Sequence, residues 1–149
     1  MEAEPSSQIV IPAKLEQLRK LAHWVERLAA QFLLPAALVH RIDLCLSELV
    51  TNLISYGFTQ GRVGAVRIRL WRQPEQIVIR IDDDGALFDP TSYKPPGLPG
   101  ALADAPEGGR GIRLVRHFAD ELHYRARPGG NQLTLVFLAG QDKAVLPEE

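Results

Sequence analysis

Hydrophobic and polar residues recur along this chain with two different periods, which predict where helices and strands lie. Apolar residues return every three or four positions through residues 14–34 and again through residues 35–56, as expected of two helices that each bury one stripe. Pro35 suits the first turn of the second helix, and Gly57 is expected to end it. A third, shorter pattern predicts a helix over residues 111–119.

Alternation of apolar and polar residues predicts strands in the rest of the chain. One alternating pair covers residues 63–72 and 76–82, and another covers residues 121–127 and 132–138; each pair is typical of a hairpin with one packed face. A β-branched stretch at residues 7–11 predicts a first strand. The expected fold is an α+β two-layer sandwich, a mainly antiparallel mixed sheet covered on one face by helices. The absence of strand–helix–strand alternation argues against a doubly wound dinucleotide fold.

Composition restricts the class of protein. The chain has 149 residues, the size of one domain, and its net charge of −1 offers no electrostatic footprint for nucleic acid or an anionic membrane. The N-terminus is acidic and unlike a signal peptide, no apolar run is long enough to span a membrane, and the single Cys45 excludes an internal disulfide. We therefore expect one cytoplasmic domain over residues 1–149, with a core at about residues 9–138 and a frayed tail at residues 141–149.

The first candidate for chemistry is a carboxylate and an amide one helical turn apart, Glu48 and Asn52. This spacing places both side chains on the same helix face. The amide oxygen suits a hard cation such as Mg²⁺, and the carboxylate can accept a proton from a hydroxyl or position a water molecule. For this pair alone, a solvated polar face or a hydrogen bond within the helix is the simpler explanation.

The second candidate is an acidic turn. Asp82, Asp83 and Asp84 end a predicted strand, and Gly85 turns the chain after them. An aspartate there can accept a hydrogen bond from an exocyclic amine, such as that of adenine. The alternative is a turn in which Asp and Gly serve only turn chemistry. Calcium binding by an EF-hand loop is set aside, because the glycine comes too early.

The third candidate is the sequence Gly-Gly-Arg-Gly at residues 108–111, directly before a predicted helix. Glycine lets the backbone approach a ligand closely, and a helix N-terminus offers free N–H groups, so together they can cradle phosphate. Arg110 could add forked hydrogen bonds to phosphate oxygens. A flexible loop before a helix has the same composition. The long proline- and glycine-rich stretch that leads here is typical of functional loops.

In combination, the three candidates resemble the N, G1 and G2 boxes of the histidine-kinase-like (GHKL) ATPase domain. Within that superfamily the chain is similar to the anti-sigma-factor serine kinases, over about residues 9–138. The narrower resemblance depends on residues 48–52 with Tyr56-Gly57-Phe58, Asp83-Asp84-Gly85 with Phe88-Asp89-Pro90, and residues 108–112 with Leu114-Val115-Arg116 and Asp120-Glu121.

The resemblance implies a role for each matching residue. Glu48 would be the general base toward a serine hydroxyl, and Asn52 would bind the Mg²⁺ that bridges the ATP phosphates. Asp83 would bind the adenine amino group, while Gly85 would keep the backbone out of the pocket. A lid is expected at about residues 91–108, and the remaining nucleotide-binding residues would be Gly108, Gly109, Arg110, Gly111 and Ile112.

Three positions depart from the family pattern. Leu87 stands where a second small residue is common, which could narrow the pocket or alter the loop. Asn131-Gln132 occupy the position of a threonine near the adenine, with Thr134 two residues later, and an amide can replace a hydroxyl in hydrogen bonding. Tyr56 replaces a histidine common near the end of the first motif.

The resemblance implies an ATP- and Mg²⁺-dependent protein serine/threonine kinase. Its substrate would be a serine on a small anti-anti-sigma (STAS-type) protein, and it would control a sigma factor by partner switching; a homodimer is also implied. The alternative is a non-catalytic module that binds nucleotide only to set the shape of a partner surface. A third hypothesis is regulation outside sigma control.

Overall fold

The computed structural model describes residues 5–58, 63–91 and 107–139, with side chains from residue 111 onward in the last range. Its strands form one sheet in the order β1-β2-β3-β5-β4, and neighbouring strands are antiparallel throughout. Their bounds are β1 (Ser6–Pro12), β2 (Ala65–Gln73), β3 (Gln76–Asp83), β4 (Glu121–Arg127) and β5 (Gly130–Leu138). Both predicted hairpins are confirmed, since Gln73 pairs with Gln76 and Arg127 pairs with Gly130.

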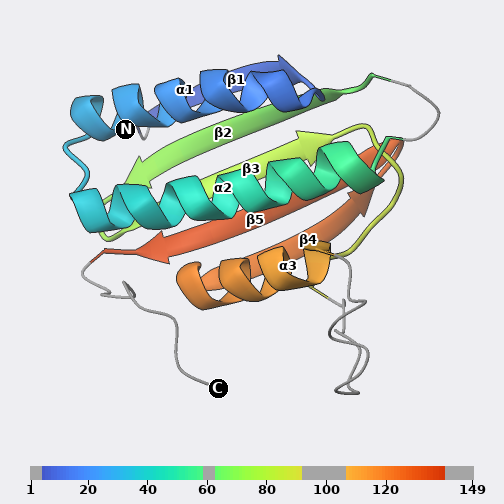
Figure 1. Cartoon of the computed structure of the whole chain (residues 1–149). Helices are drawn as coiled ribbons and strands as arrows, with labels where there is room; N and C mark the ends of the chain where they lie inside the picture. The colour runs from blue at the N-terminus through green and yellow to red at the C-terminus, as the bar shows by residue number, and fades with distance from the viewer. Residues whose placement is uncertain (1–4, 59–62, 92–106, 140–149) are drawn as a thin grey trace.

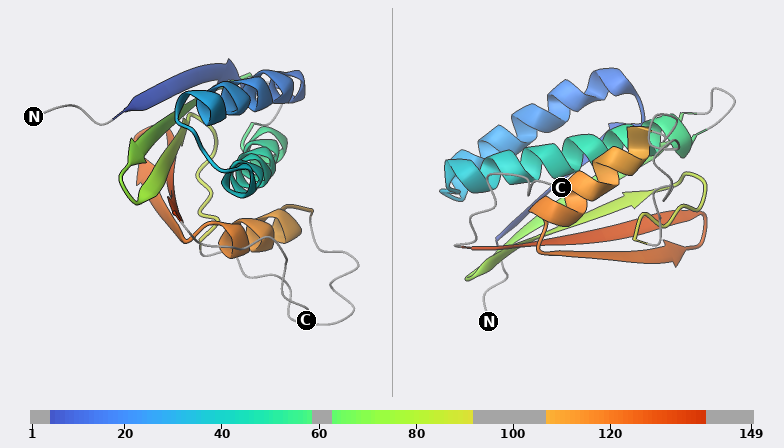
Figure 2. Two further views of the ribbon diagram at one scale, coloured as in Figure 1. Left: turned by 90° about the vertical axis from the view of Figure 1, so that its left-hand side faces the viewer. Right: turned by 60° about the horizontal axis from the view of Figure 1, so that its bottom comes forward.

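The helices of the described residues all lie on one face of this sheet (Figures 1 and 2). They are the short 3-10 helix η1 (Leu15–Gln17), α1 (Leu18–Gln31), α2 (Ala36–Tyr56) and α3 (Glu107–Phe118). α2 lies between α1 and α3 and packs against both. The expected α+β two-layer sandwich is confirmed. Among the described residues, no helix is both long and apolar enough to cross a membrane.

The core fills the space between the two layers. Alternate strand residues point toward the helices, as the period of two requires, and they are buried: Ile9 and Ile11, Val66, Ile68 and Leu70, Ile77, Ile79 and Ile81, and Leu133, Leu135 and Phe137. The strand register continues the inward-facing row of Ile11 and Val66 through Asp83 to Asn131. The sheet therefore places a carboxylate beside an amide at one end of an otherwise apolar face.

The connection between α1 and α2 differs from the prediction that the first helix continues to residue 34. α1 ends at Gln31, and Leu33 adopts a left-handed backbone conformation with φ 55°. The Leu34 N–H donates to the Ala29 carbonyl oxygen at 2.9 Å, which is the long bond of a Schellman motif. α2 then begins at Ala36 with Pro35 as its N-cap rather than in its first turn.

α3 begins earlier than the predicted residue 111. It starts at Glu107, so Gly108, Gly109 and Gly111 belong to the helix instead of a loop before it. Glycine disfavours helix interiors, which is why the composition indicated a loop. Close packing of α3 against α2, described below, explains why position 111 nevertheless carries no side chain.

A buried arginine ties α2 to the far end of α3. Arg41 is 2% exposed, and its guanidinium donates to the Phe118 carbonyl oxygen from Nε at 3.1 Å and from Nη2 at 3.0 Å. Nη2 also forms an ion pair of 2.9 Å with Asp120, whose carboxylate accepts the Leu138 N–H at 2.7 Å. A charge within the apolar stripe of α2 is the signal in the sequence that could have predicted a buried Arg41.

Candidate functional site

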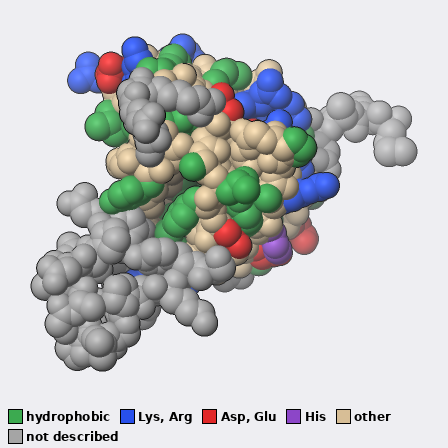
Figure 3. Space-filling model, turned by 90° about the vertical axis from the view of Figure 1, so that its right-hand side faces the viewer, with side chains coloured by type: hydrophobic (Ala, Val, Ile, Leu, Met, Phe, Trp, Pro, Cys, Tyr) green, Lys and Arg blue, Asp and Glu red, His purple; other side chains and the backbone are tan. Residues whose placement is uncertain are grey.

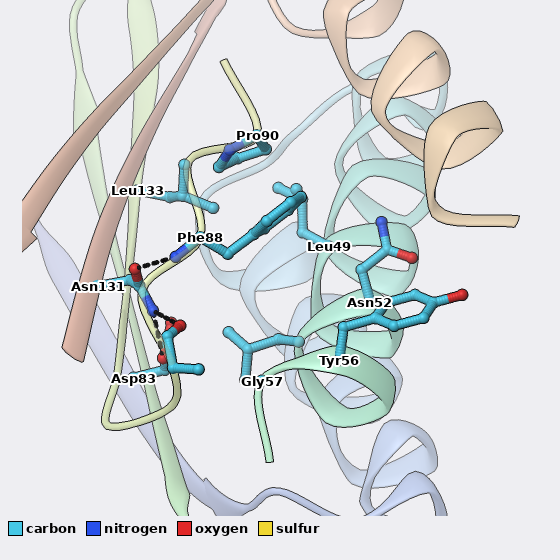
Figure 4. A pocket seen from close by; sticks show the side chains of 11 residues that line it. Leu49, Asn52, Tyr56, Gly57, Asp83, Phe88, Pro90, Asn131 and Leu133 are labelled. Carbon is cyan, nitrogen blue, oxygen red and sulfur yellow. Dashed lines mark hydrogen bonds between the residues drawn. The ribbon is translucent and has the colours of Figure 1, made fainter. Parts of the chain in front are cut away.

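The candidate site lies at the end of the molecule where α2 and β3 finish and where α3 and β5 begin (Figure 1). A cavity of about 40 Å³ opens there, shown in Figure 4. A mostly apolar wall with a few polar groups is typical of a ligand pocket. The lining residues are Leu49, Asn52, Leu53, Tyr56, Gly57, Asp83, Ala86, Phe88, Pro90, Asn131 and Leu133.

Asp83 supplies the buried carboxylate of this cavity. Its Oδ1 accepts the Gly85 N–H at 2.8 Å and the Asn131 Nδ2–H at 3.0 Å. Burial raises the pKa of the Asp83 carboxyl above its ordinary value, and these two hydrogen bonds offset only part of the rise. Within the described part of the chain, its hydrogen bonds all go to Oδ1, which leaves Oδ2 able to accept one from a ligand.

Gly85 lets the turn after β3 pack against the end of α2. The Ala86 N–H donates to the Gly57 carbonyl oxygen at 2.8 Å. A β-carbon at Gly85 would lie 2.8 Å from that same oxygen, so a side chain at this position would push the turn away from α2. The turn that carries Asp83 is therefore fixed to the helix that carries Asn52.

Glu48 and Asn52 meet the beginning of α3 at Gly111. A β-carbon at position 111 would lie 2.5 Å from Glu48 Oε2 and 3.4 Å from Asn52 Nδ2. Asn52 also lines the cavity with Asp83, whereas Glu48 lies one helical turn farther from it. Asn52 is thus the link between the cavity and the Glu48–Gly111 contact, and the three motifs converge on one end of the fold.

The rest of the glycine motif is described only in part. Gly108 and Gly109 lie in α3, and Ile112 is buried at 1% exposure, so the Ile112 side chain is not exposed to a ligand. The side chain of Arg110 lies outside the described residues, as do residues 92–106, which make up most of the expected lid. Their expected roles stay predictions.

The departures from the family pattern occupy different places in the structure. Asn131 lies beside Asp83, as expected, while Thr134 pairs with Arg80 and His123 farther along the sheet. Leu87 is 67% exposed and is not part of the cavity wall, so it does not narrow the pocket. Its neighbours Ala86 and Phe88 line the cavity instead. Tyr56 lies at its rim, half exposed.

The loop after β3 is held at several points. Asp84 Oδ1 accepts the Ala65 N–H at 3.0 Å, and Asp89 Oδ1 accepts the Thr91 N–H at 2.8 Å. Arg116 on α3 donates to the carbonyl oxygens of Pro90, at 3.0 Å, and Thr91. α3 therefore supports the wall of the cavity at its last described residues.

The cavity as it stands is too small for a nucleotide base, because ligand pockets typically measure about 300–1,000 Å³. Its wall must therefore move before a base can enter. Phe88 is the largest lining side chain on the loop after β3 and is 43% exposed; Figure 4 shows its ring directed toward Leu49 across the cavity. Figure 3, which looks onto this end of the molecule, shows hydrophobic side chains near its centre.

The donor set fits a purine nucleotide with its cation. Asp83 Oδ2 is an acceptor for an exocyclic amine, and the amide of Asn52 can supply an oxygen to a hard cation. The described residues hold no group of three or more His, Cys, Asp or Glu side chains placed for a metal ion. A cation held here would therefore depend on Asn52 together with oxygens of the ligand, an arrangement that Mg²⁺ favours.

Comparison with known proteins agrees with this geometry. Residues 11–137 match the family described as "Histidine kinase-like ATPase domain". The chain is 38% identical over 114 residues to the serine/threonine-protein kinase BtrW of Bordetella bronchiseptica, a match that covers 76% of this chain and 80% of that protein.

A solved structure shares the fold. The RsbU and RsbW domains of Rv1364c from Mycobacterium tuberculosis superpose with a TM-score of 0.65 at 15% identity, over 90% of this chain and 32% of that one. The family match spans most of the chain and includes all three motifs. The chain therefore belongs to the histidine kinase-like ATPase family, and a serine/threonine-protein kinase is among its relatives.

Proposed function

We propose that this protein is an ATP-dependent serine kinase that phosphorylates a small STAS-type anti-anti-sigma protein and thereby controls a sigma factor by partner switching. One observation carries the proposal: Asn52 lines the same cavity as Asp83 and also meets Gly111 beside Glu48. The residues proposed as base site, cation ligand and proton acceptor thus follow one another along one end of the fold. The kinase named BtrW, similar over most of its length, supports the choice of reaction.

The roles of the residues follow from what phosphoryl transfer requires, which is positioning and charge neutralisation. Asp83 would accept a hydrogen bond from the amino group of the base, and Asn52 would offer an oxygen to a Mg²⁺ ion, which would supply neutralisation of the phosphate charge. The serine oxygen of the partner forms a bond to the γ-phosphorus as the bond to the bridging oxygen of ADP breaks. Glu48 accepts the proton that the serine hydroxyl loses.

The test is transfer of labelled phosphate from ATP to a purified STAS-type partner. Glu48→Ala should lower the rate by about 10²–10⁴-fold, the contribution expected of a general base, while the dissociation constant for ADP stays within about three-fold. Ser47→Ala, at the exposed neighbouring position, is the matched control and should transfer normally. Normal transfer by Glu48→Ala would remove Glu48 from the reaction.

The same experiment separates the alternative function. Tight nucleotide binding by the wild-type protein without any label on the partner would favour a non-catalytic module that changes shape with nucleotide. Absence of nucleotide binding would reject both functions. Our proposal also includes a homodimer, which light scattering tests, and a sigma factor as second partner, which co-elution with and without ATP tests.

A further inference from the structure

Asn131 uses every hydrogen-bonding group of its side chain within the protein. Its Nδ2 donates to Asp83 Oδ1 at 3.0 Å and to the Ala86 carbonyl oxygen at 2.8 Å. Its Oδ1 accepts the Phe88 N–H at 3.0 Å and the Tyr124 hydroxyl. A primary amide has two N–H donors and two acceptor lone pairs, so these contacts exhaust it. The Asn131 side chain therefore has no donor or acceptor left for a direct hydrogen bond to a ligand.

Three of the four partners of Asn131, namely Asp83, Ala86 and Phe88, line the cavity. Asp83 ends β3, Ala86 and Phe88 form the loop that follows, and Tyr124 belongs to β4. Figure 4 shows the Asn131 amide between the Asp83 carboxylate and the Phe88 backbone. A single side chain, 5% exposed, thus holds both the carboxylate that faces the cavity and the loop that forms its wall.

We propose that Asn131 is a positioning residue for base recognition: it fixes the Asp83 carboxylate so that Oδ2 faces the cavity, and so sets the preference for a ring that carries an exocyclic amino group. The inference rests on the proposed nucleotide site. It differs from direct replacement of a threonine hydroxyl, because the amide acts on the base only through Asp83.

Asn131 affects base recognition through the orientation of the Asp83 carboxylate. The two oxygens of a carboxylate are equivalent until neighbours distinguish them, and here both recorded donors, Gly85 N–H and Asn131 Nδ2–H, select Oδ1. Without the amide, the Gly85 N–H would be the one donor left to Asp83 among the described residues, and the bonds from Asn131 to the Ala86 oxygen and the Phe88 N–H would be lost. The carboxylate could then rotate, and the geometry that distinguishes an amino group from a hydrogen atom would be lost.

The first test measures discrimination between two ligands. ADP and purine riboside 5′-diphosphate differ only in the 6-amino group, and calorimetry gives both dissociation constants. We expect wild-type protein to prefer ADP by at least ten-fold and Asn131→Ala to lose most of that preference. If Asn131→Ala binds both ligands more weakly by the same factor, the ratio of the two dissociation constants stays as in the wild type. That result would overturn the proposal, because loss of packing alone has that effect.

Gln132→Ala is the matched control. Gln132 is the neighbouring amide on β5, and its Nε2 donates to Asp82 Oδ1 at 2.8 Å, away from the cavity. The Gln132→Ala variant should have the same ratio of dissociation constants for the two ligands as the wild type. If Asn131→Ala does not fold, Tyr124→Phe removes only the hydroxyl that Asn131 Oδ1 accepts and should give an intermediate ratio; a ratio unchanged from the wild type would count against the proposal.

A second measurement does not need nucleotide. The Asn131 hydrogen bond favours the charged form of Asp83, so loss of this bond should raise the pKa of the Asp83 carboxyl. Carbon NMR of the nucleotide-free protein measures this pKa. Gln132→Ala should leave it unchanged. An equal pKa in Asn131→Ala and wild type would overturn the proposal. If the wild type bound neither ligand, the proposed function would fail, while this titration would still decide whether Asn131 holds Asp83.

Discussion

Gly111 lies against the carboxylate of Glu48, so closely that a β-carbon at position 111 would come within 2.5 Å of Oε2. The two residues belong to different motifs and to different helices, α3 and α2. Because Glu48 also lies one turn from Asn52, the start of α3 determines how much room the Glu48 carboxylate has. The glycine thus matters for the position of the proposed proton acceptor as well as for the proposed phosphate binding.

Gly111→Ala should therefore lower phosphate transfer without lowering stability. The new methyl group displaces the Glu48 carboxylate, and a displacement of about 1 Å can reduce a rate by about 10²-fold. Alanine is a better helix former than glycine by about 1 kcal/mol, so the unfolding midpoint should stay equal or rise. Initial rates of label transfer and thermal unfolding give the two results.

A second substitution separates this effect from damage to phosphate binding. Glu48→Asp shortens the side chain and should relieve the contact, so adding Gly111→Ala to Glu48→Asp should reduce the rate less than it does in the wild type. Equal reductions in both backgrounds would show that Gly111 acts independently of Glu48.

The sequence predicted the sheet well because its signal is local. Ile77, Ile79 and Ile81 alternate with polar residues, and their burial follows directly from a period of two. The order of the three motifs also predicted which residues converge, since Asn52 and Asp83 line one cavity.

What the sequence did not predict depends on contacts between distant segments. The Arg41–Asp120 and Asn131–Asp83 contacts join residues 79 and 48 positions apart, and no local pattern records such pairs. The start of α3 was placed too late because packing against α2 overrides the weak helix propensity of its glycines. Leu33 was placed within a helix because its left-handed conformation is unusual for a leucine.

Arg41→Ala should be strongly destabilising. It would leave the Asp120 carboxylate, 7% exposed, and the Phe118 carbonyl oxygen without their charged donor, and breaking a buried pair typically costs about 3–5 kcal/mol. Urea denaturation followed by circular dichroism measures the loss.

Arg127→Ala is the matched control for that experiment. Its ion pair with Asp82 has the same 2.9 Å distance, but the arginine side chain is 45% exposed, so the expected loss is about 0–1 kcal/mol. Similar losses for both variants would show that burial does not strengthen the Arg41 pair.

Protonation of Asp83 at low pH should stabilise the folded protein but weaken nucleotide binding. Burial raises its pKa in the folded protein, so its contribution to stability is fully present below the unfolded pKa of about 3.9 and is lost as pH rises through the folded pKa. Relative to Asp83→Asn, the free energy of unfolding should therefore fall as pH rises through this window. Affinity for ADP should rise over the same window, because the charged carboxylate is the better acceptor.

Urea titrations of both proteins at a series of pH values test the first trend, and calorimetry with ADP tests the second. The other carboxylates titrate in both proteins, so their contribution cancels in the difference between the wild type and Asp83→Asn. A stability difference that grows with pH would mean that hydrogen bonds to Asp83, and not its burial, dominate its pKa.

Phe88→Ala should accelerate nucleotide binding. The ring crosses a cavity of about 40 Å³, so its displacement is part of binding, and association is slow when a conformational change must precede contact. The substitution leaves the backbone N–H that donates to Asn131 in place, so the hold on Asp83 is retained. Stopped-flow measurement with a fluorescent ADP analogue should show association about three-fold faster or more.

Leu87→Ala isolates the role of the ring. Leu87 is the adjacent large side chain on the same loop, but it is 67% exposed and does not line the cavity. Its removal changes loop hydrophobicity without changing cavity volume, so the association rate should equal that of the wild type. Slower association in Phe88→Ala would mean that the ring forms part of the surface on which the base lands, whereas equal acceleration in both variants would attribute the effect to loosening of the loop.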